Sequence, residues 1–398
     1  MPLSKTVYLD YAASAPRRDV VAQAELAYDQ SCYAGANPNS LHSLGRQAAR
    51  ALDSARSDVA RALGGRFRPA DVTFTSGGTE SNNLCVLGLT EAAHIAQGSR
   101  NRVILSAIEH DSVLDLAPVL RGRGYSVDLV RPARDGRVTS ETLESLMGPD
   151  VALVSVMYAN NETGVVQDVP ELAKVAHKSG AVFHTDAIQA FGHVPLDLAE
   201  VDAVSLAAHK IGGPVGAGAV AVRGRVPIRP MLVGGGQELG RRAGTEDVRG
   251  ALGFAAAARW CSENLQTSRS KTASMANLLY GLLCAEGTGI VPTTTATADD
   301  GKLPGIVSVM VPKLDSETMI LELDRQGFEV SAGSACSSGS LDPSHVLSAM
   351  GIARNDALGS LRVSFDERID EQDIRDFAEA LLGIVEKHRG DSGHGSQA

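Results

Sequence analysis

Short apolar runs rich in β-branched residues alternate with helix-length stretches, and this alternation constrains the fold more than any other feature of the sequence. The runs have strand length and lie at Val72–Thr75, Val103–Ala107, Val127–Val130, Val151–Met157, Ala181–Thr185, Val201–Leu206 and Ala217–Val222. Most are separated by helix-like stretches, at His42–Leu63, Glu80–Gln97, Ser112–Leu120, Glu141–Met147 and Val169–Ser179. Continuously apolar strands between helices are typical of a parallel sheet covered on both faces. The sequence therefore predicts an α/β fold with a mostly parallel sheet.

The pattern changes after Asp247. Two helix-like stretches, Val248–Cys261 and 262–285, are followed by a polar loop and by short strands that alternate with helices. This change predicts a second, smaller α+β domain, since a chain of 398 residues is too long for one hydrophobic core. The expected division is a large domain at 15–262, a small domain at 1–14 plus 263–388, and a disordered tail at 389–398.

Composition excludes several classes of protein. The net charge of −10 argues against direct nucleic-acid binding, which needs clustered Lys and Arg. No apolar run approaches the ~18 residues of a membrane span, and the first residues, with Asp10 among them, are not typical of a signal peptide. The five cysteines are dispersed without a C-x-x-C pair, which disfavours a disulfide framework or a local metal site. We therefore expect a cytoplasmic protein with no metal site and no membrane contact.

Polar residues that follow the predicted strands are the candidate ligand contacts, because ligands of an open parallel sheet bind at the carboxyl ends of its strands. Gly77, Gly78 and Thr79 follow Val72–Thr75 and lead into a helix. Glycines let backbone N–H groups approach an anion, and a helix N-terminus adds partial positive charge. The stretch is thus a candidate phosphate cradle, although a capped glycine turn is favoured when it is taken alone.

Four further candidates follow other predicted strands: His110, Asn161, Asp186 and Lys210. A carboxylate at the end of a buried strand needs a partner, such as a protonated heterocyclic nitrogen. A buried lysine has a lowered pKa, which makes its amine nucleophilic. Each residue alone also has a structural explanation, such as a hydrogen-bonded histidine, an Asn-rich turn or a surface lysine. Together, in chain order at successive strand ends, they fit pyridoxal phosphate, whereas the glycine fingerprint of NAD sites is missing.

The sequence as a whole resembles the class V aminotransferases, which are fold-type I pyridoxal phosphate enzymes, and within them the cysteine desulfurases of the NifS/IscS type. The resemblance runs from Tyr8 to about Arg368. It is carried by Tyr8–Ala13, Thr75–Ser81, Glu109–His110, Asn160–Glu162, His184–Gln189, His209–Lys210 and Arg242–Thr245. The most discriminating stretch is Ser334–Ser340 with Pro343–Leu347, which is similar to the longer active-site loop of the group I enzymes.

The resemblance implies a role for each candidate residue around pyridoxal 5'-phosphate. Lys210 would form the Schiff base with the cofactor and later move protons at the substrate α-carbon. Asp186 would keep the pyridine nitrogen protonated, and His110 would stack on the ring and assist proton transfer. Gln189 would bind the phenolic oxygen. The residues implied for the phosphate are Gly78, Thr79 and His209.

The same resemblance implies contacts to the substrate and to a second subunit. Asn161, beside the cofactor, would fix the substrate carboxylate together with Arg362, whose guanidinium can bind it as a fork. Thr245 matches a family residue that reaches the phosphate of the partner subunit, which implies a homodimer. One position departs from the family: many members have Ser where this chain has Ala207, so one phosphate hydrogen bond, worth about 1–2 kcal/mol, is in doubt.

Cys336 lies in a stretch of small residues, Ala332–Gly339, which is the opposite of a packed core. A loop cysteine without a role is the structural alternative. In the family resembled here, the thiolate at this place takes sulfur from L-cysteine as a persulfide and alanine is released. The sulfur would then pass to an acceptor protein, such as an iron–sulfur scaffold or a tRNA-thiolating enzyme.

Other functions remain open from the sequence. A selenocysteine lyase or a small-amino-acid aminotransferase of the same family would share most of the motifs, but an aminotransferase would not need Cys336. A non-catalytic scaffold that keeps the fold is a third possibility, and the presence of Lys210, Asp186 and Cys336 argues against it.

Overall fold

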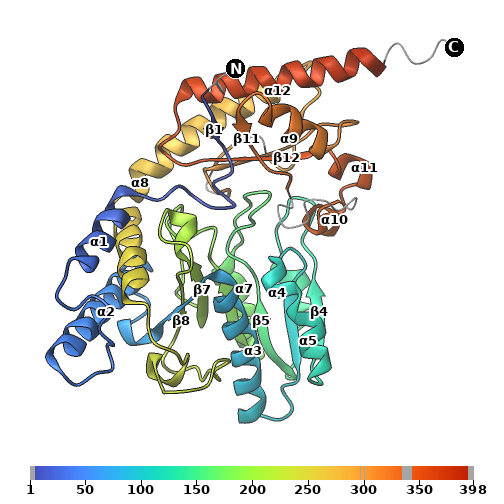
Figure 1. The fold of residues 1–398 in the computed structure, drawn as a ribbon. Helices are drawn as coiled ribbons and strands as arrows, with labels where there is room; N and C mark the ends of the chain where they lie inside the picture. Colours follow the sequence, from blue (N-terminus) through green and yellow to red (C-terminus); the bar gives the residue numbers. More distant parts are fainter. Residues whose placement is uncertain (1–4, 296, 300, 334–342, 393–398) are drawn as a thin grey trace.

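A seven-stranded sheet forms the centre of the larger part of the molecule (Figure 1). The computed structural model describes residues 5–295, 297–299, 301–333 and 343–392. The strand order is β2-β8-β7-β6-β5-β3-β4. The strands are β2 (Val72–Thr75), β3 (Arg102–Ser106), β4 (Ser126–Val130), β5 (Val151–Ser155), β6 (Val182–Asp186), β7 (Ala203–Ala207) and β8 (Gly218–Val222). Each predicted apolar run supplies one strand, and the predicted α/β fold is confirmed.

Alternate residues of the central strands belong to two separate hydrophobic cores. Ile104 packs into one core and its neighbour Val103 into the other. In the same way Val204 and Ala203 lie in different cores. Successive side chains of a strand point to opposite faces of a sheet, so both faces of this one are buried. This explains why the strands read as continuous apolar runs rather than as alternating ones.

Helices supply the outer layers of these two cores. One core takes side chains from α3 (Gly78–Ala96), α4 (Asp111–Leu114) and α5 (Leu116–Gly122). The opposite core takes them from α1 (Asp19–Asp29), α2 (Ser43–Ala62), α6 (Ser140–Glu144), α7 (Val169–Lys178) and α8 (Val248–Leu283). In the part of the chain that the structure describes, no helix has the length and apolar character to cross a membrane.

All strands of the sheet except β8 have their carboxyl ends at one edge. β3 to β7 pair in parallel, while β8 is antiparallel to both β7 and β2, so that β2 points the same way as β7. The sequence did not indicate the reversal at β8. Its reason is the short connection from β7, residues 208–217, which contains only the 3-10 turn η2 (Ala208–Ile211). A parallel connection needs a crossover of a dozen or more residues.

The second, smaller part is α+β, as predicted (Figure 1). It contains an antiparallel sheet of order β12-β10-β9 and a parallel pair, β1-β11. The strands are β1 (Val7–Tyr8), β9 (Val291–Pro292), β10 (Ile306–Met310), β11 (Phe328–Glu329) and β12 (Ser360–Ser364). The helices are α9 (Ser316–Asp324), α10 (His345–Ala349), α11 (Arg354–Ala357) and α12 (Glu371–Ser392).

A core separate from those of the large sheet lies in this smaller part. It combines Val7 and Leu9 from the start of the chain with side chains of β10, β12, α9, α12 and the last turns of α8. The two predicted stretches Val248–Cys261 and 262–285 form one helix, α8, which passes from one part to the other (Figure 1). At the other end α12 continues to Ser392, so residues 389–392 of the predicted tail are helical, and 393–398 lie outside the described residues.

Lys302 is an unusual member of the smaller part, because its side chain is almost completely buried, at 2% exposure. Its Nζ donates to the hydroxyl of Tyr280 and to the carbonyl of Thr295, the latter at 3.1 Å. It also lies 4.6 Å from the centre of the Tyr280 ring. Burial lowers the pKa of Lys302 from 10.5 to about 8. Below that pH, the folded protein therefore contains a buried ammonium group.

Replacing Lys302 with Met should change how stability depends on pH. Below pH 8 both the folded and the unfolded wild type bind the proton, and between about 8 and 10.5 only the unfolded chain still holds it. Stability rises with pH wherever the unfolded state binds more protons. Relative to Lys302→Met, the wild-type free energy of unfolding should thus rise by about 3 kcal/mol from neutral to alkaline pH. Urea denaturation across this range measures it, and a constant difference between the two proteins would contradict it.

Candidate active site

A cavity of about 420 Å³ lies where the parallel strands end. Its walls come from the start of the chain, the first turn of α3, the segments after β3, β5, β6 and β7, and strand β12. Residues predicted from the sequence that line it are Gly78, Thr79, His110, Asn161, Asp186, Gln189, His209, Lys210 and Arg362. The structure therefore brings together nearly all of the predicted site residues described in it.

The N-terminus of α3 is open towards the cavity. Its N-cap, Gly77, has φ of 151°, a conformation that side chains disfavour, and no side chain caps the helix. The first N–H groups of a helix have no partner within the helix, and Gly78 and Thr79 both line the cavity. A Cβ at Gly78 would approach the end of the Ile188 side chain to 2.4 Å, so any other residue here would have to displace that side chain. These donors and the helix dipole fit an anion such as a phosphate.

Asp186 is the last residue of β6 and is 4% exposed. Its Oδ1 accepts the Ile188 N–H at 2.9 Å, and its Oδ2 accepts from Asn82 Nδ2 at 2.7 Å. Burial raises the pKa of Asp186 above its ordinary value, opposed by these hydrogen bonds and by the charge of Lys210. A cationic ring nitrogen in the cavity would stabilise the charged carboxylate.

Lys210 is held in the turn η2, directly after β7. Its Nζ donates to the carbonyl oxygens of Ala12 at 2.5 Å and Ala13 at 2.9 Å. Gln189 Nε2 donates to the same Ala12 carbonyl at 2.8 Å. The start of the chain thus fixes both side chains at the cavity wall. An amine so placed can form a Schiff base with an aldehyde bound in the cavity.

His110 is the N-cap of α4, and the hydrogen bond by which it caps the helix sets the orientation of its ring. Its Nδ1 accepts the Ser112 N–H at 3.0 Å and lies 2.9 Å from Ser112 Oγ. The neutral ring therefore carries its proton on Nε2.

The preceding Glu109 is fully buried, and its Oε1 accepts the Met157 N–H at 2.5 Å. Burial raises the pKa of Glu109 well above its ordinary value.

His209 and Ala207 lie on either side of the turn that begins η2. Burial lowers the pKa of His209 to about 4, with the charge of Lys210 as a lesser cause. The imidazole is then neutral at pH 7, and its Nδ1 lies 3.3 Å from Ser14 Oγ. It can offer a phosphate a hydrogen bond but no charge. Ala207 lines the same cavity and adds no donor to it.

Arg362 lies on β12 and is 1% exposed, yet it reaches the cavity. Its Nη1 donates to the carbonyl of Asn161 at 2.9 Å, and its Nη2 to Asp10 Oδ1 at 2.8 Å. Among the described residues its buried Nε has no hydrogen-bond partner. A buried donor of this kind is stabilised by a ligand acceptor. A carboxylate in the cavity would be such an acceptor, because guanidinium groups bind carboxylates with two parallel hydrogen bonds.

One predicted residue that the structure describes, Thr245, is not part of this cavity. Thr245 is exposed and lines a separate cavity together with Ser76 and Arg242, whose guanidinium pairs with Glu80 at 2.8 Å. Cys336 lies outside the described residues. The structure thus gives no position for the predicted sulfur-accepting thiol.

Sequence reasoning missed residues that support the predicted ones. Asn82 donates to Asp186, Asp10 pairs with Arg362, and Ser112 fixes His110. The one available signal was for Asn82, a polar residue in a helix-like stretch whose buried position needs a partner. Asp10 follows β1 and Ser112 lies in the first turn of α4, and the sequence pattern gives no partner for either.

Comparisons with known proteins agree with this geometry. Residues 7–377 match the model of the family described as aminotransferase class-V. The cysteine desulfurase NifS of Azotobacter vinelandii is 38% identical over 371 residues, which are 92% of this chain and 90% of that protein. The IscS-like cysteine desulfurase of Mycobacterium tuberculosis is 38% identical over 388 residues, 96% of this chain and 97% of that protein.

A solved structure of a NifS-like protein superposes with a TM-score of 0.86 at 33% identity, covering 96% of this chain and 99% of that one. The chain belongs to the class V aminotransferases, among the cysteine desulfurases of the NifS and IscS type.

Proposed function

We propose that this protein is a pyridoxal phosphate-dependent cysteine desulfurase that converts L-cysteine to L-alanine and passes the sulfur to its own Cys336. The observation that carries the proposal is the meeting of Lys210, Asp186 and Arg362 in one cavity beside the open N-terminus of α3. An amine, a buried carboxylate, a guanidinium and an anion site are the groups that this cofactor and an amino-acid substrate require.

The residues that line the cavity fit pyridoxal phosphate in the roles that the family resemblance implies for them. Gly78, Thr79 and His209 would hold the phosphate, and Asp186 would pair with the ring nitrogen. Gln189 would bind the phenolic oxygen. When bound, the cofactor supplies an aldehyde that joins the amine of the substrate and a ring that withdraws electrons from its α-carbon.

Arg362 and Asn161 would hold the substrate carboxylate. The guanidinium is already fixed by Asp10 and by the Asn161 carbonyl, so little side-chain freedom is lost when the substrate binds. Its buried Nε has no partner within the described part of the chain, and the substrate carboxylate would supply the acceptor that this donor lacks. In this proposal the substrate α-carbon would lie between β12 and the turn that carries Lys210.

Lys210 and His110 would move the protons. The Lys210 amine would take a proton from the substrate α-carbon and return it during the reaction. His110, with its Nδ1 bonded to Ser112, would stack on the cofactor ring and exchange a proton through Nε2. The Cys336 thiolate would then bond to the substrate sulfur as the carbon–sulfur bond breaks; the electron pair of that bond would stay with the β-carbon, which takes up a proton to give alanine, and the persulfide would remain on the enzyme.

We also propose that the active protein is a cytoplasmic homodimer that delivers persulfide sulfur to an acceptor protein, such as an iron–sulfur scaffold or a tRNA-thiolating enzyme. In support of the dimer, Thr245 is exposed in a cavity of its own rather than in that of Lys210. Exposed apolar side chains, Val215 and Leu239, adjoin Gly216 and Glu238, which line the same cavity. Exposed apolar groups beside a cavity are typical of an interaction surface.

We further propose the division into a large domain at 15–262 and a small domain at 1–14 plus 263–388. The separate core that contains Val7 and Leu9 supports assigning the start of the chain to the small domain. The continuous helix α8 would then cross the boundary rather than end at it.

The test of the function is the covalent link at Lys210. Protein saturated with pyridoxal phosphate should absorb light at the short-wavelength end of the visible spectrum. Reduction with borohydride should leave the cofactor covalently attached to the peptide that contains Lys210. Lys210→Ala should lose both signals and reduce alanine release from L-cysteine by about 10³-fold, since both the attachment point and the proton carrier are removed. Lys174→Ala, an exposed lysine paired with Glu171, is the matched control and should match the wild type. Normal turnover by Lys210→Ala would refute the assignment.

Arg362→Lys should weaken substrate binding while the positive charge is kept. An ammonium cannot form the two parallel hydrogen bonds of a guanidinium. We expect KM for L-cysteine to rise about 10–100-fold, which corresponds to about 1.5–3 kcal/mol for a hydrogen bond to a charged group. Arg375→Lys, on the exposed side of α12, serves as the control. An unchanged KM in Arg362→Lys would mean that the carboxylate binds elsewhere.

Cys336→Ser should separate binding from sulfur transfer. The variant should bind the cofactor and change its absorbance on addition of L-cysteine, because those steps use Lys210 and Arg362. It should not release alanine, since a serine hydroxyl is not ionised at neutral pH and oxygen is a poor acceptor for this sulfur. Mass spectrometry of the wild type should find one added sulfur on the Cys336 peptide.

The exposed Cys32 provides the control for this experiment, because Cys32→Ser should behave as the wild type. Undiminished alanine release from Cys336→Ser, or added sulfur mainly on another cysteine, would show that Cys336 is not the sulfur-accepting thiol. Transamination without sulfur release would favour the alternative function, an aminotransferase of the same family.

A further inference from the structure

Arg18 joins the turn η2 (Ala208–Ile211), called the lysine turn below, to helix α8 and to the segment after β12. It is 7% exposed. Its Nε donates to the Ile211 carbonyl at 3.0 Å, one residue after Lys210. Its guanidinium carbon lies 3.6 Å from the centre of the Trp260 ring on α8. The side chain is therefore held by a hydrogen bond on one edge and by an aromatic face on the other.

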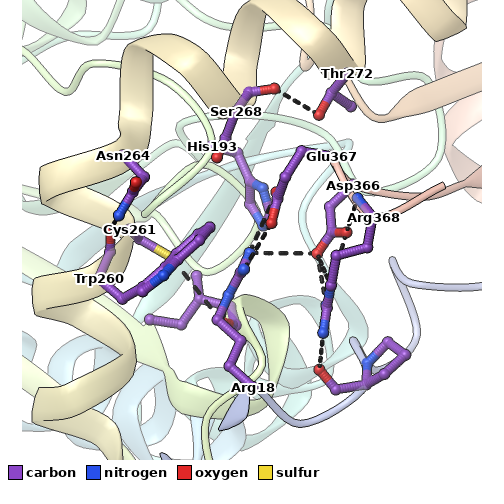
Figure 2. Close-up of polar contacts among 12 residues, drawn as sticks. Arg18, His193, Trp260, Cys261, Asn264, Ser268, Thr272, Asp366, Glu367 and Arg368 are labelled. Atoms are coloured by element: carbon purple, nitrogen blue, oxygen red, sulfur yellow. Dashed lines mark hydrogen bonds and ion pairs between the residues drawn. The ribbon is translucent and has the colours of Figure 1, made fainter. Parts of the chain in front are cut away.

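Two carboxylates bind the outer end of Arg18. Nη1 donates to Glu367 Oε1 at 2.7 Å, and Nη2 to Asp366 Oδ2 at 3.3 Å (Figure 2). Asp366 is itself bound by Arg368 Nε at 2.9 Å, and Arg368 Nη1 donates to the Pro16 carbonyl at 2.9 Å. These residues follow directly on β12, the strand that carries Arg362.

The backbone around Arg18 is also joined to the lysine turn. The Ala15 N–H donates to the His209 carbonyl at 3.1 Å, and the Arg18 N–H to the Gly212 carbonyl at 2.9 Å. On the opposite side, His193 Nε2 lies 3.1 Å from the Lys210 carbonyl, and burial lowers the pKa of His193, so the neutral ring donates there. Every residue from His209 to Gly212 therefore has its carbonyl held by a neighbouring segment.

Stability alone does not explain a buried group of this kind. Removing an arginine and its carboxylates from water is so unfavourable that apolar side chains of similar size often stabilise a core as well or better. What an ion pair adds is direction, because its hydrogen bonds fix one arrangement of the segments that carry it. Here those segments are the lysine turn and the strand of Arg362.

We propose that Arg18 is a positioning residue, which acts through Ile211 on one side and through Asp366 and Glu367 on the other to set the place of Lys210 relative to Arg362. The inference rests on the roles proposed above for Lys210 and Arg362. Arg362 fixes the carboxylate of the substrate, so the distance from Lys210 to the substrate α-carbon depends on the link between these two segments. A misplacement of about 1 Å at a reacting group can lower a rate by about 100-fold.

The test compares Arg18→Met, Arg18→Lys and the neighbouring Arg17→Met by hydrogen exchange and by kinetics. Met keeps the contact with Trp260 and removes the hydrogen bonds. Arg17 is exposed and pairs with Glu25 rather than with the lysine turn, which makes it the matched control. Amides of residues 208–213 should exchange about tenfold faster in Arg18→Met, with and without cofactor, while those of Arg17→Met match the wild type.

The Arg18→Met substitution should slow proton transfer and leave substrate binding nearly unchanged. In Arg18→Met kcat should drop about tenfold with KM for L-cysteine within about twofold of the wild type, because Arg362 still binds the carboxylate. L-cysteine with deuterium on the α-carbon should show a larger isotope effect on kcat than in the wild type, since the step made slow is the proton transfer by Lys210. The kcat of Arg18→Lys should lie between those of the wild type and Arg18→Met.

Two results would overturn the proposal: unchanged exchange at 208–213 in folded Arg18→Met, or an unchanged kcat, whether or not KM rises. Should Arg18→Met fail to fold, Glu367→Gln decides the question, because it removes one arm of the network and keeps Arg18; it should show the same changes to a smaller degree. The borohydride label on Lys210 in the wild type tests the proposed function independently, and exchange at 208–213 is measured whether or not that label is found.

Discussion

The parallel pairing of the central strands decides where polar side chains of this protein can meet. Inside the sheet they satisfy one another: His184 lies 2.9 Å from the hydroxyls of both Ser155 and Ser205, and burial lowers its pKa to about 3, so it stays neutral. At the edge where β6 and β7 end, Asp186 and Lys210 instead face a cavity. The common direction of the strands brings them to that edge together with the N-terminus of α3.

The segment from Asp10 to Arg18 connects the two halves of the site. Its carbonyl groups accept hydrogen bonds from Lys210 and Gln189. Asp10, at its start, pairs with Arg362, and Arg18, at its end, binds the lysine turn. Just before it, β1 and Leu9 belong to the core of the smaller part. The position of the catalytic lysine proposed here therefore depends on packing in a core that does not contain it.

The sequence predicted the features that follow from local pattern. Seven apolar runs gave seven strands, and the rule that ligands bind at strand ends selected Asp186 and Lys210 before any partner was known. It could not give the reversal at β8, which depends on the length of a turn, or the pairing of Arg362 with Asp10, which joins opposite ends of the chain. Contacts of that kind are set by tertiary packing, and residue type alone does not report them.

The turn at 160–164 shows that a functional and a structural interpretation of one motif can both hold for neighbouring residues. Asn160 is fully buried, and its Oδ1 accepts the N–H groups of Glu162 and Thr163 at 3.0 and 2.9 Å, as expected of an Asn-rich turn. Asn161 instead lines the cavity and holds Arg362 through its carbonyl. Glu162 then accepts the hydroxyl of Ser344, which caps α10.

This turn therefore contacts both the arginine proposed to bind the substrate and the first helix after the Cys336 segment. Ser344 Oγ accepts the Val346 N–H at 3.1 Å, so the start of α10 is fixed by the same hydroxyl that donates to Glu162. Burial raises the pKa of Glu162, which is 3% exposed, while the hydrogen bond from Ser344 and the charge of Arg362 lower it. Because Asn160 Oδ1 orders the backbone at Glu162 and Thr163, one buried amide supports both the turn that holds Arg362 and the carboxylate that accepts from Ser344 at the start of α10.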